Sequence, residues 1–322
     1  MKAAVLHQLG TTPRYEDFPE PVIENENQII ITVKAASVKN LDKGRASGAH
    51  YASYKHLPAI VGIDAAGTLP DGTRVYGSGI SGTIAEKALI HKNTYTVLPD
   101  HIDDVTAAAL PNAVMGAALA LHRAGMKAGD TVLINGATGV TGQAAIQIAK
   151  HYGAKRIIAT GRNPESLKLL PELGADELIS LQQEDNFILD ALKEIHKKYP
   201  IDIVIDYTWG HPAEMILEVL KGGGLHVGTH KVRFVTVGGM AGDKIQLSSA
   251  ALRSSAIEIL GSGIGSLPAE AIEKMYAEIL PEMFELAANG KLKIATEIRS
   301  LKDVEAAWQE NIPAGKRLVI II

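Results

Sequence analysis

The sequence predicts an α/β protein in which a doubly wound parallel sheet is joined to a second, β-rich part. Strands and long helices alternate between residues 131 and 260, as parallel strands with crossover helices require. A turn of small residues follows the first of these strands. Before about residue 105, short strand patterns are separated by Gly, Pro and Asp, which is typical of a small barrel or sandwich. The 322 residues suffice for about two domains.

The elements can be assigned in order. The β-rich part has expected strands at residues 28–35, 74–77 and 83–88, and the Ala-rich segment 106–121 is expected to form a buried helix. The alternating part has expected strands at 131–135, 156–160, 201–206, 232–237 and 257–260, and helices at 139–151, 187–198 and 212–220. A helical pattern at 268–288, interrupted at Pro281, and a last strand at 316–322 are too short for a third domain. We expect them to rejoin the β-rich part. The stretch 222–232 resembles an insertion that the sequence does not explain.

Composition excludes several classes of protein. Hydrophobic residues make up 46% and charged residues 21% of the chain, which excludes disorder as the main state. The net charge of −4 and the lack of a basic tract argue against nucleic acid as a partner. The absence of cysteine excludes disulfides, a thiol nucleophile and Cys-ligated zinc. Neither a run of roughly 20 apolar residues nor a secretory signal is evident, so we expect a cytoplasmic protein without membrane contact.

The turn after the strand at 131–135 predicts a nucleotide site. Gly139 and Gly142 occupy the last two positions of a G-x-G-x-x-G pattern, and Ala137 occupies the first. Small residues let the backbone approach a pyrophosphate, which the free amides at the start of the next helix then attract. A structural tight turn is the alternative. The position between a strand and a helix, within a series of such units, favours the Rossmann-type site.

The end of the next strand predicts which dinucleotide binds. NAD sites place an acidic residue about 20 residues after the glycines, where it binds the ribose hydroxyls. Here that position holds Arg162, between Gly161 and Asn163. A guanidinium can bind the additional phosphate of NADP with several donors. The alternative is an arginine that only faces solvent, and we predict NADPH.

Together these features resemble the medium-chain dehydrogenase/reductase superfamily, and within it the zinc-free quinone oxidoreductase (ζ-crystallin-like) branch. The similarity extends over nearly the whole chain, through segments 38–48, 57–62, 74–77, 82–86, 98–100, 107–111, the glycine turn and 261–263. It implies a GroES-like catalytic domain from residues 1–107 and 268–322, and a Rossmann NADP-binding domain from residues 108–267. It also implies a homodimer.

The resemblance further implies chemistry without a metal. Zinc-dependent relatives hold their ion with a Cys and a G-H-E-x-x-G segment, whereas this chain has Gly62-Ile63-Asp64-Ala65-Ala66-Gly67 and no Cys. Without a Lewis acid, hydride transfer from NADPH to a quinone or an α,β-unsaturated carbonyl is favoured over alcohol oxidation. An NADP-dependent zinc-type alcohol dehydrogenase of the same superfamily, and a nucleotide-binding protein with little turnover, are the alternatives.

Candidate site residues follow from the matched segments. The family's V-N-x-x-D segment reads Val38-Lys39-Asn40-Leu41-Asp42, so either Lys39 or Asn40 is expected to line the substrate site; a solvated Lys39 is the alternative. Tyr51 matches a family tyrosine that could donate to a carbonyl or form an apolar wall. Gly116 departs from the family's Thr beside the nicotinamide. The residues expected to bind cofactor are Asn112, Ala137, Thr138, Gly139, Val140, Gly161, Arg162, Asn163, Gly238, Gly239, Met240, Ile264 and Lys316.

Overall fold

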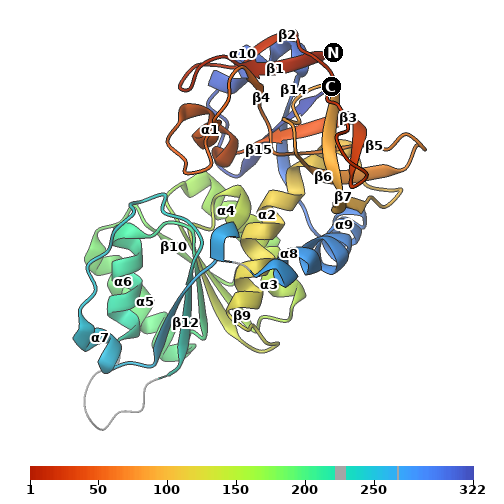
Figure 1. Cartoon of the computed structure of the whole chain (residues 1–322). Coiled ribbons are helices and arrows are strands. Elements are labelled where there is room, and N and C mark those ends of the chain that lie inside the picture. Colours follow the sequence, from red (N-terminus) through yellow and green to blue (C-terminus); the bar gives the residue numbers. More distant parts are fainter. Residues whose placement is uncertain (222–229, 267) are drawn as a thin grey trace. The chain divides into compact units, whose positions relative to one another are not determined.

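The structure is a computed structural model that describes residues 1–221, 230–266 and 268–322 (Figure 1). The chain folds as two compact units. Unit 1 comprises Met1–Pro111 and Ile272–Ile322, and unit 2 comprises Asn112–Ala271. Most of the unexplained stretch 222–232 lies outside the described residues.

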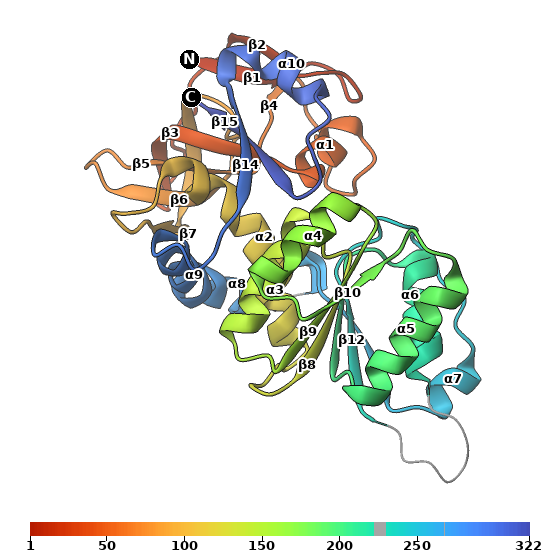
Figure 2. The ribbon, with the colours of Figure 1, turned by 180° about the vertical axis from the view of Figure 1, so that it is seen from behind.

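Unit 2 is built on one parallel sheet with the strand order β10-β9-β8-β11-β12-β13. Its strands are β8 (Thr131–Asn135), β9 (Arg156–Gly161), β10 (Glu177–Ser180), β11 (Ile203–Asp206), β12 (Val232–Thr236) and β13 (Ile257–Gly261). Every residue of β8 and β11 is buried, because helices cover both faces of the sheet. Figures 1 and 2 show α3 and α4 on one face and α5 and α6 on the other. The predicted doubly wound α/β fold is confirmed.

The helices of unit 2 follow their strands in sequence. They are α3 (Val140–His151), α4 (Pro164–Leu173), α5 (Asp185–Lys198), α6 (Gly210–Leu220) and α7 (Ser249–Arg253). The sequence analysis missed α4, β10 and α7. Helix α4 contains an interior proline, Pro171, which argues against a helix, and β10 and α7 are only four and five residues long.

Unit 1 is the β-rich part. One sheet has the order β14-β15-β3-β5-β6-β7, and β7 also pairs with β3, which closes these strands on themselves. A second sheet has the order β2-β1-β4. The elements are β1 (Lys2–Leu6), β2 (Arg14–Asp17), β3 (Gln28–Val38), α1 (Asn40–Ser47), β4 (Ala59–Ile60), β5 (Asp64–Thr68), β6 (Arg74–Gly79), β7 (Lys87–Val97), β14 (Ala295–Ser300), α10 (Val304–Gln309) and β15 (Lys316–Ile321). The strand expected at 83–88 begins later and extends further than predicted: Ala85 makes only an isolated bridge to Ala3, and β7 extends from Lys87 to Val97.

The helical pattern near the C-terminus is broken earlier than its proline suggests. The segment forms α8 (Ala269–Lys274), a π-helical turn (Met275–Ile279) and α9 (Leu280–Ala288). Pro281 lies in the first turn of α9, directly after the π turn, where the regular helical hydrogen-bond pattern is already interrupted. Tyr276 in this turn joins β6 and β7 through its contacts with Ser78 Oγ (2.6 Å) and Thr96 Oγ1 (2.9 Å). The segment therefore rejoins the β-rich unit.

Helix α2 (Asp104–Arg123) is the one helix among the described residues whose length and composition would suit a membrane span. Within the most apolar stretch of α2, 67% is buried inside the protein. A buried core helix meets the same criteria, so α2 is weak evidence for a membrane.

Candidate functional site

The predicted nucleotide turn joins β8 to α3 in unit 2. Gly139 is the N-cap of α3 and provides no capping side chain, which leaves backbone amides of the first turn without an intrahelical partner. A Cβ on Gly142 would lie 2.6 Å from Ala137 Cα, so only glycine lets this helix pack against the turn. Ala137 is buried and its N–H donates to Thr160 O at 2.8 Å. The turn thus presents amides at a helix N-terminus, as an anion site requires.

The end of β9 lies against this turn. A Cβ on Gly161 would collide with Thr138 Cγ2, so the glycine allows Thr138 to sit over the strand end. Arg162 follows directly and is exposed. The Oδ1 atom of Asn163 accepts a hydrogen bond from Ser166 N at 2.8 Å and caps α4. The structure therefore brings Thr138 and Gly161 together and shows that Asn163 also stabilises a helix.

The turn after β12 holds Gly238, Gly239 and Met240. Gly238 N donates to Asp206 O at 3.3 Å, and a Cβ on Gly238 would lie 2.8 Å from Tyr207 O. Met240 is 69% exposed. These residues follow the same edge of the sheet as the glycine turn, because β12 is parallel to β11 and β11 to β8.

The unusual Gly116 has a structural explanation within unit 2. A Cβ at this position would lie 2.7 Å from Thr141 Cγ2 in the first turn of α3. The carbonyl of Gly116 accepts a hydrogen bond from Tyr207 OH at 3.0 Å. Asn112 lies one turn earlier in α2 and is half-buried. Threonine at position 116 would therefore require Thr141 to move.

In unit 1, Lys39 points into the protein interior. The residue is 2% exposed, and its Nζ lies 2.6 Å from Asp64 Oδ1, 3.3 Å from Asp42 Oδ2 and 3.1 Å from Ser37 O. Lys39 N also donates to Asp42 Oδ2 at 2.9 Å across the start of α1. Arg317 is buried and its charge interacts with both carboxylates. Burial raises the pKa of Asp42, and the nearby Lys39 ammonium opposes this rise.

The two other predicted catalytic residues are exposed. Asn40 is the first residue of α1, and Tyr51 is 84% exposed with its ring centroid 4.1 Å from that of His50. Arg45 of α1 donates to Ala52 O at 2.9 Å and so connects the loop of Tyr51 to the helix. These contacts place Asn40 and Tyr51 on neighbouring segments, whereas Lys39 is enclosed.

Two further predicted cofactor residues lie at the starts of other elements. Lys316 begins β15 in unit 1, and its Nζ lies 2.6 Å from Glu297 Oε1 on the neighbouring strand β14. Ile264 is the first residue of a short 3-10 helix, Ile264–Ser266.

The residues at the expected metal position do not suit zinc. Catalytic zinc needs three protein ligands, and at this position the chain has Ile63 and Asp64. The Asp64 carboxylate is already paired with the Lys39 ammonium. Within residues 1–221, 230–266 and 268–322, no cluster of His, Asp or Glu side chains has the arrangement of a metal site.

Sequence reasoning missed a buried polar row beneath the glycine turn. Thr160, Asn135 and Asp206 face one another in register across β9, β8 and β11, and all three are fully buried. Each follows a run of apolar residues near the end of its strand, and this change from apolar to polar was the available signal.

The fold and the site define a class of protein: a two-unit α/β protein with a glycine turn at the C-terminal edge of its parallel sheet. A family model described as "zinc-binding dehydrogenase" matches residues 140–283. The human quinone oxidoreductase is 33% identical over 305 residues, which cover 91% of this chain and 87% of that protein. The pig quinone oxidoreductase is 32% identical, covering 80% and 78%.

Solved structures agree with this class. A mycobacterial quinone oxidoreductase superposes with a TM-score of 0.87 at 21% identity, over 100% of both chains, and supports the fold alone. The Thermus thermophilus quinone oxidoreductase, whose structure was also solved as a complex with NADPH, has a TM-score of 0.83 and 26% identity over 100% of both chains. The chain belongs to the quinone oxidoreductase family of the medium-chain dehydrogenase/reductase superfamily, as predicted.

Proposed function

We propose that this oxidoreductase uses NADPH to reduce a quinone or an α,β-unsaturated carbonyl without a metal ion. The observation that carries the proposal is the position of Arg162, an exposed cation directly after Gly161, which itself contacts the nucleotide turn through Thr138. The names of two relatives agree: the human protein is a quinone oxidoreductase, and a 33% identical Arabidopsis thaliana protein, aligned over 62% of this chain, is an NADPH-dependent alkenal/one oxidoreductase.

The residues of unit 2 would hold the dinucleotide. Amides of Thr138, Gly139 and Val140 suit the pyrophosphate because they lie at the start of α3. Arg162 suits the 2′-phosphate, since a guanidinium forms several charge-assisted hydrogen bonds to one phosphate. Bound NADPH would supply the hydride. We assign Asn112, Gly238, Gly239, Met240, Ile264 and Lys316 to the nicotinamide part of the cofactor as a hypothesis from the family resemblance.

The carbonyl of the acceptor needs a hydrogen-bond donor as negative charge develops on it. Asn40 and Tyr51 are the exposed candidates in unit 1. The enclosed Lys39 is engaged by Ser37 and Asp64, so we assign it a positioning role at the start of α1. Conjugated acceptors are already electrophilic and require less polarisation than an alcohol or simple ketone. This is why the proposed chemistry proceeds without zinc. A homodimer and a cytoplasmic location remain predictions.

The experiment follows NADPH oxidation with a panel of quinones and enones, together with metal analysis of the protein. We expect turnover that survives chelation, and substoichiometric zinc. Stoichiometric zinc whose removal abolishes turnover would favour an alcohol dehydrogenase instead. Binding of NADPH without oxidation by any acceptor would favour a nucleotide-binding protein with little turnover.

Cofactor preference is tested by Arg162→Gln, with Arg156→Gln as a matched control. Arg156 begins the same strand and pairs with Glu177 at 3.0 Å, at the opposite end from Arg162. Loss of charge-assisted bonds in Arg162→Gln should raise the Kd of NADPH roughly 10- to 100-fold and change that of NADH little. Arg156→Gln should affect both cofactors equally. Equal losses for NADPH and NADH in Arg162→Gln would show that Arg162 does not bind the phosphate.

A further inference from the structure

The carboxylate of Asp206 collects hydrogen bonds at the end of β11. Its Oδ1 accepts from Asn135 Nδ2 at 2.8 Å, Thr208 N at 3.1 Å and Thr208 Oγ1 at 3.0 Å. Its Oδ2 accepts from Trp209 N at 3.0 Å. The residue is fully buried, and a buried carboxylate is tolerated only when such donors replace its hydration.

These bonds continue in one direction to the glycine turn. Gly136 N donates to Thr160 Oγ1 (3.3 Å), and this hydroxyl donates to Asn135 Oδ1 (2.5 Å). Asn135 Nδ2 then donates to Asp206 Oδ1 and to Thr208 Oγ1 (2.6 Å). Each hydroxyl both accepts and donates, and Asp206 only accepts. The carboxylate thus fixes the orientation of the Asn135 amide and of both threonine hydroxyls.

The turn that Asp206 holds is strained and lies against the nucleotide turn. Trp209 has φ 52° and ψ −157°, a conformation that non-glycine residues rarely adopt, and its N–H is bound by Asp206. A Cβ on Gly136 would lie 2.8 Å from Thr208 Cγ2, so the two turns are in close contact. The backbone carbonyl of Asp206 also accepts from Val237 N at 2.7 Å, which brings in the turn after β12.

We propose that Asp206 is a positioning residue for the cofactor: its carboxylate sets the place of the turn at Gly136–Gly139 through Asn135 and Thr160, and that of the turn at Tyr207–Gly210 directly. The proposal rests on the function proposed above. It goes further because neither the glycine pattern nor Arg162 involves Asp206. The residue acts through the backbone of the turns, and it makes no contact with the reacting atoms.

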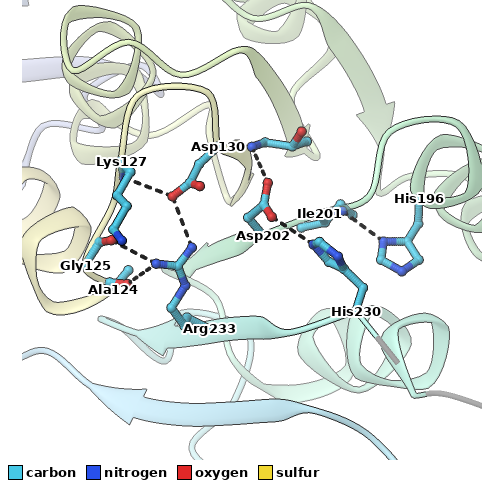
Figure 3. Close-up of polar contacts among 10 residues, drawn as sticks. Ala124, Gly125, Lys127, Asp130, His196, Ile201, Asp202, His230 and Arg233 are labelled. Atoms are coloured by element: carbon cyan, nitrogen blue, oxygen red, sulfur yellow. Dashed lines mark hydrogen bonds and ion pairs between the residues drawn. The ribbon is translucent and has the colours of Figure 1, made fainter. Parts of the chain in front are cut away.

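Asp202 provides a matched control from the other end of the same strand. It directly precedes β11 and accepts a hydrogen bond from Thr131 N at 2.7 Å, while its Oδ1 lies 2.8 Å from His230 Nε2 (Figure 3). Asp202 therefore also connects a backbone amide and a side chain. It lies at the N-terminal end of the strands, whereas the glycine turn lies at their C-terminal end. Removing it should cost stability without moving the cofactor site.

The experiment measures the Kd of NADPH by its fluorescence and the Tm of each variant. Asp206→Ala should raise the Kd roughly tenfold or more, because a small displacement of a binding turn weakens its hydrogen bonds to the ligand. Asp202→Ala should lower the Tm and leave the Kd close to that of the wild type. Thr208→Val keeps the shape of the side chain and should raise the Kd less than Asp206→Ala. If Asp206→Ala does not fold, the Kd of Thr208→Val tests the proposal in its place.

The proposal is overturned if Asp206→Ala, or Thr208→Val in its place, lowers the Tm while the Kd stays at the wild-type value, as in Asp202→Ala. Asp206→Asn provides a second check, because its amide keeps an acceptor for Asn135 but places a donor toward Trp209 N; an intermediate Kd is expected. Failure of the wild-type protein to bind NADPH would instead refute the proposed function, so the two failures are distinguishable.

Discussion

The two ends of the parallel sheet in unit 2 use polar groups differently: those at the C-terminal end are fully buried, and those at the N-terminal end are half-buried. At the C-terminal end, Asp206, Asn135 and Thr160 form hydrogen bonds beneath turns that leave helix amides available. At the N-terminal end, Arg233 pairs with Asp130 at 3.1 Å and donates to Ala124 O at 2.8 Å (Figure 3). In open α/β sheets ligands bind outside the carboxyl ends of the strands. Under the proposed function, the C-terminal end would position the dinucleotide, whereas the N-terminal end connects elements of the unit.

Glycine substitutions at the C-terminal end should have the largest effect. In Gly161→Ala the new Cβ would collide with Thr138, so the turn must move, and we expect the Kd of NADPH to rise roughly 100-fold with a lower Tm. In Gly139→Ala the nearest atom is Gly136 O at 3.7 Å, so the protein accommodates the methyl group. Gly139→Ala should weaken binding with an unchanged Tm. Equal Tm losses for both variants would contradict this distinction.

The buried Lys39 ammonium in unit 1 tests how much a buried ion-pair cluster contributes to the stability of the protein. Lys39→Met leaves Asp42 and Asp64 buried without their ammonium partner, which should lower the free energy of unfolding by about 3–5 kcal/mol. Urea denaturation measures this change. The exposed pair of Lys2 and Asp17 provides the control, and Lys2→Met should change stability little. If both variants lose the same stability, burial does not control the energy of the Lys39 cluster.

The smallest expected effect is a pH dependence of stability that arises from His196, at the N-terminal end of the sheet in unit 2. His196 accepts from Ile201 N at 3.1 Å through Nδ1, and burial, together with the nearby His230, lowers its pKa below the ordinary 6.5. The neutral form is therefore favoured in the folded state. The stability that neutral His196 contributes to the fold is fully present above the unfolded-state pKa. This stability is lost as the pH falls through the lower folded-state pKa.

His196→Asn tests this pH effect, because the asparagine oxygen can accept from Ile201 N and does not titrate. Thermal denaturation between neutral and mildly acidic pH should show a smaller decrease of Tm in the variant than in the wild type. NADPH affinity should be the same in both. Identical pH profiles of Tm would refute the role of His196.

Local patterns in the sequence predicted part of the candidate site. The glycine turn, Gly161 and Arg162 lie within single strand–turn–helix segments, so their spacing carries the information. The partners Asn135 and Asp206 are 71 residues apart and meet only through strand register. Lys39, directly after β3, likewise pairs with Asp64 of β5. This pairing buries the Lys39 side chain, which would be solvated in an isolated loop. The fold class was predictable because apolar strands alternated with helices over most of unit 2.

Hydrogen exchange of backbone amides with and without NADPH tests the central claim most directly, because it observes both ends of the sheet in one measurement. We predict protection by NADPH at residues 136–141 and 161–163, and no change at residues 127–131 and 230–233. Protection confined to the N-terminal segments, or no protection anywhere at saturating NADPH, would contradict a cofactor site at the C-terminal end.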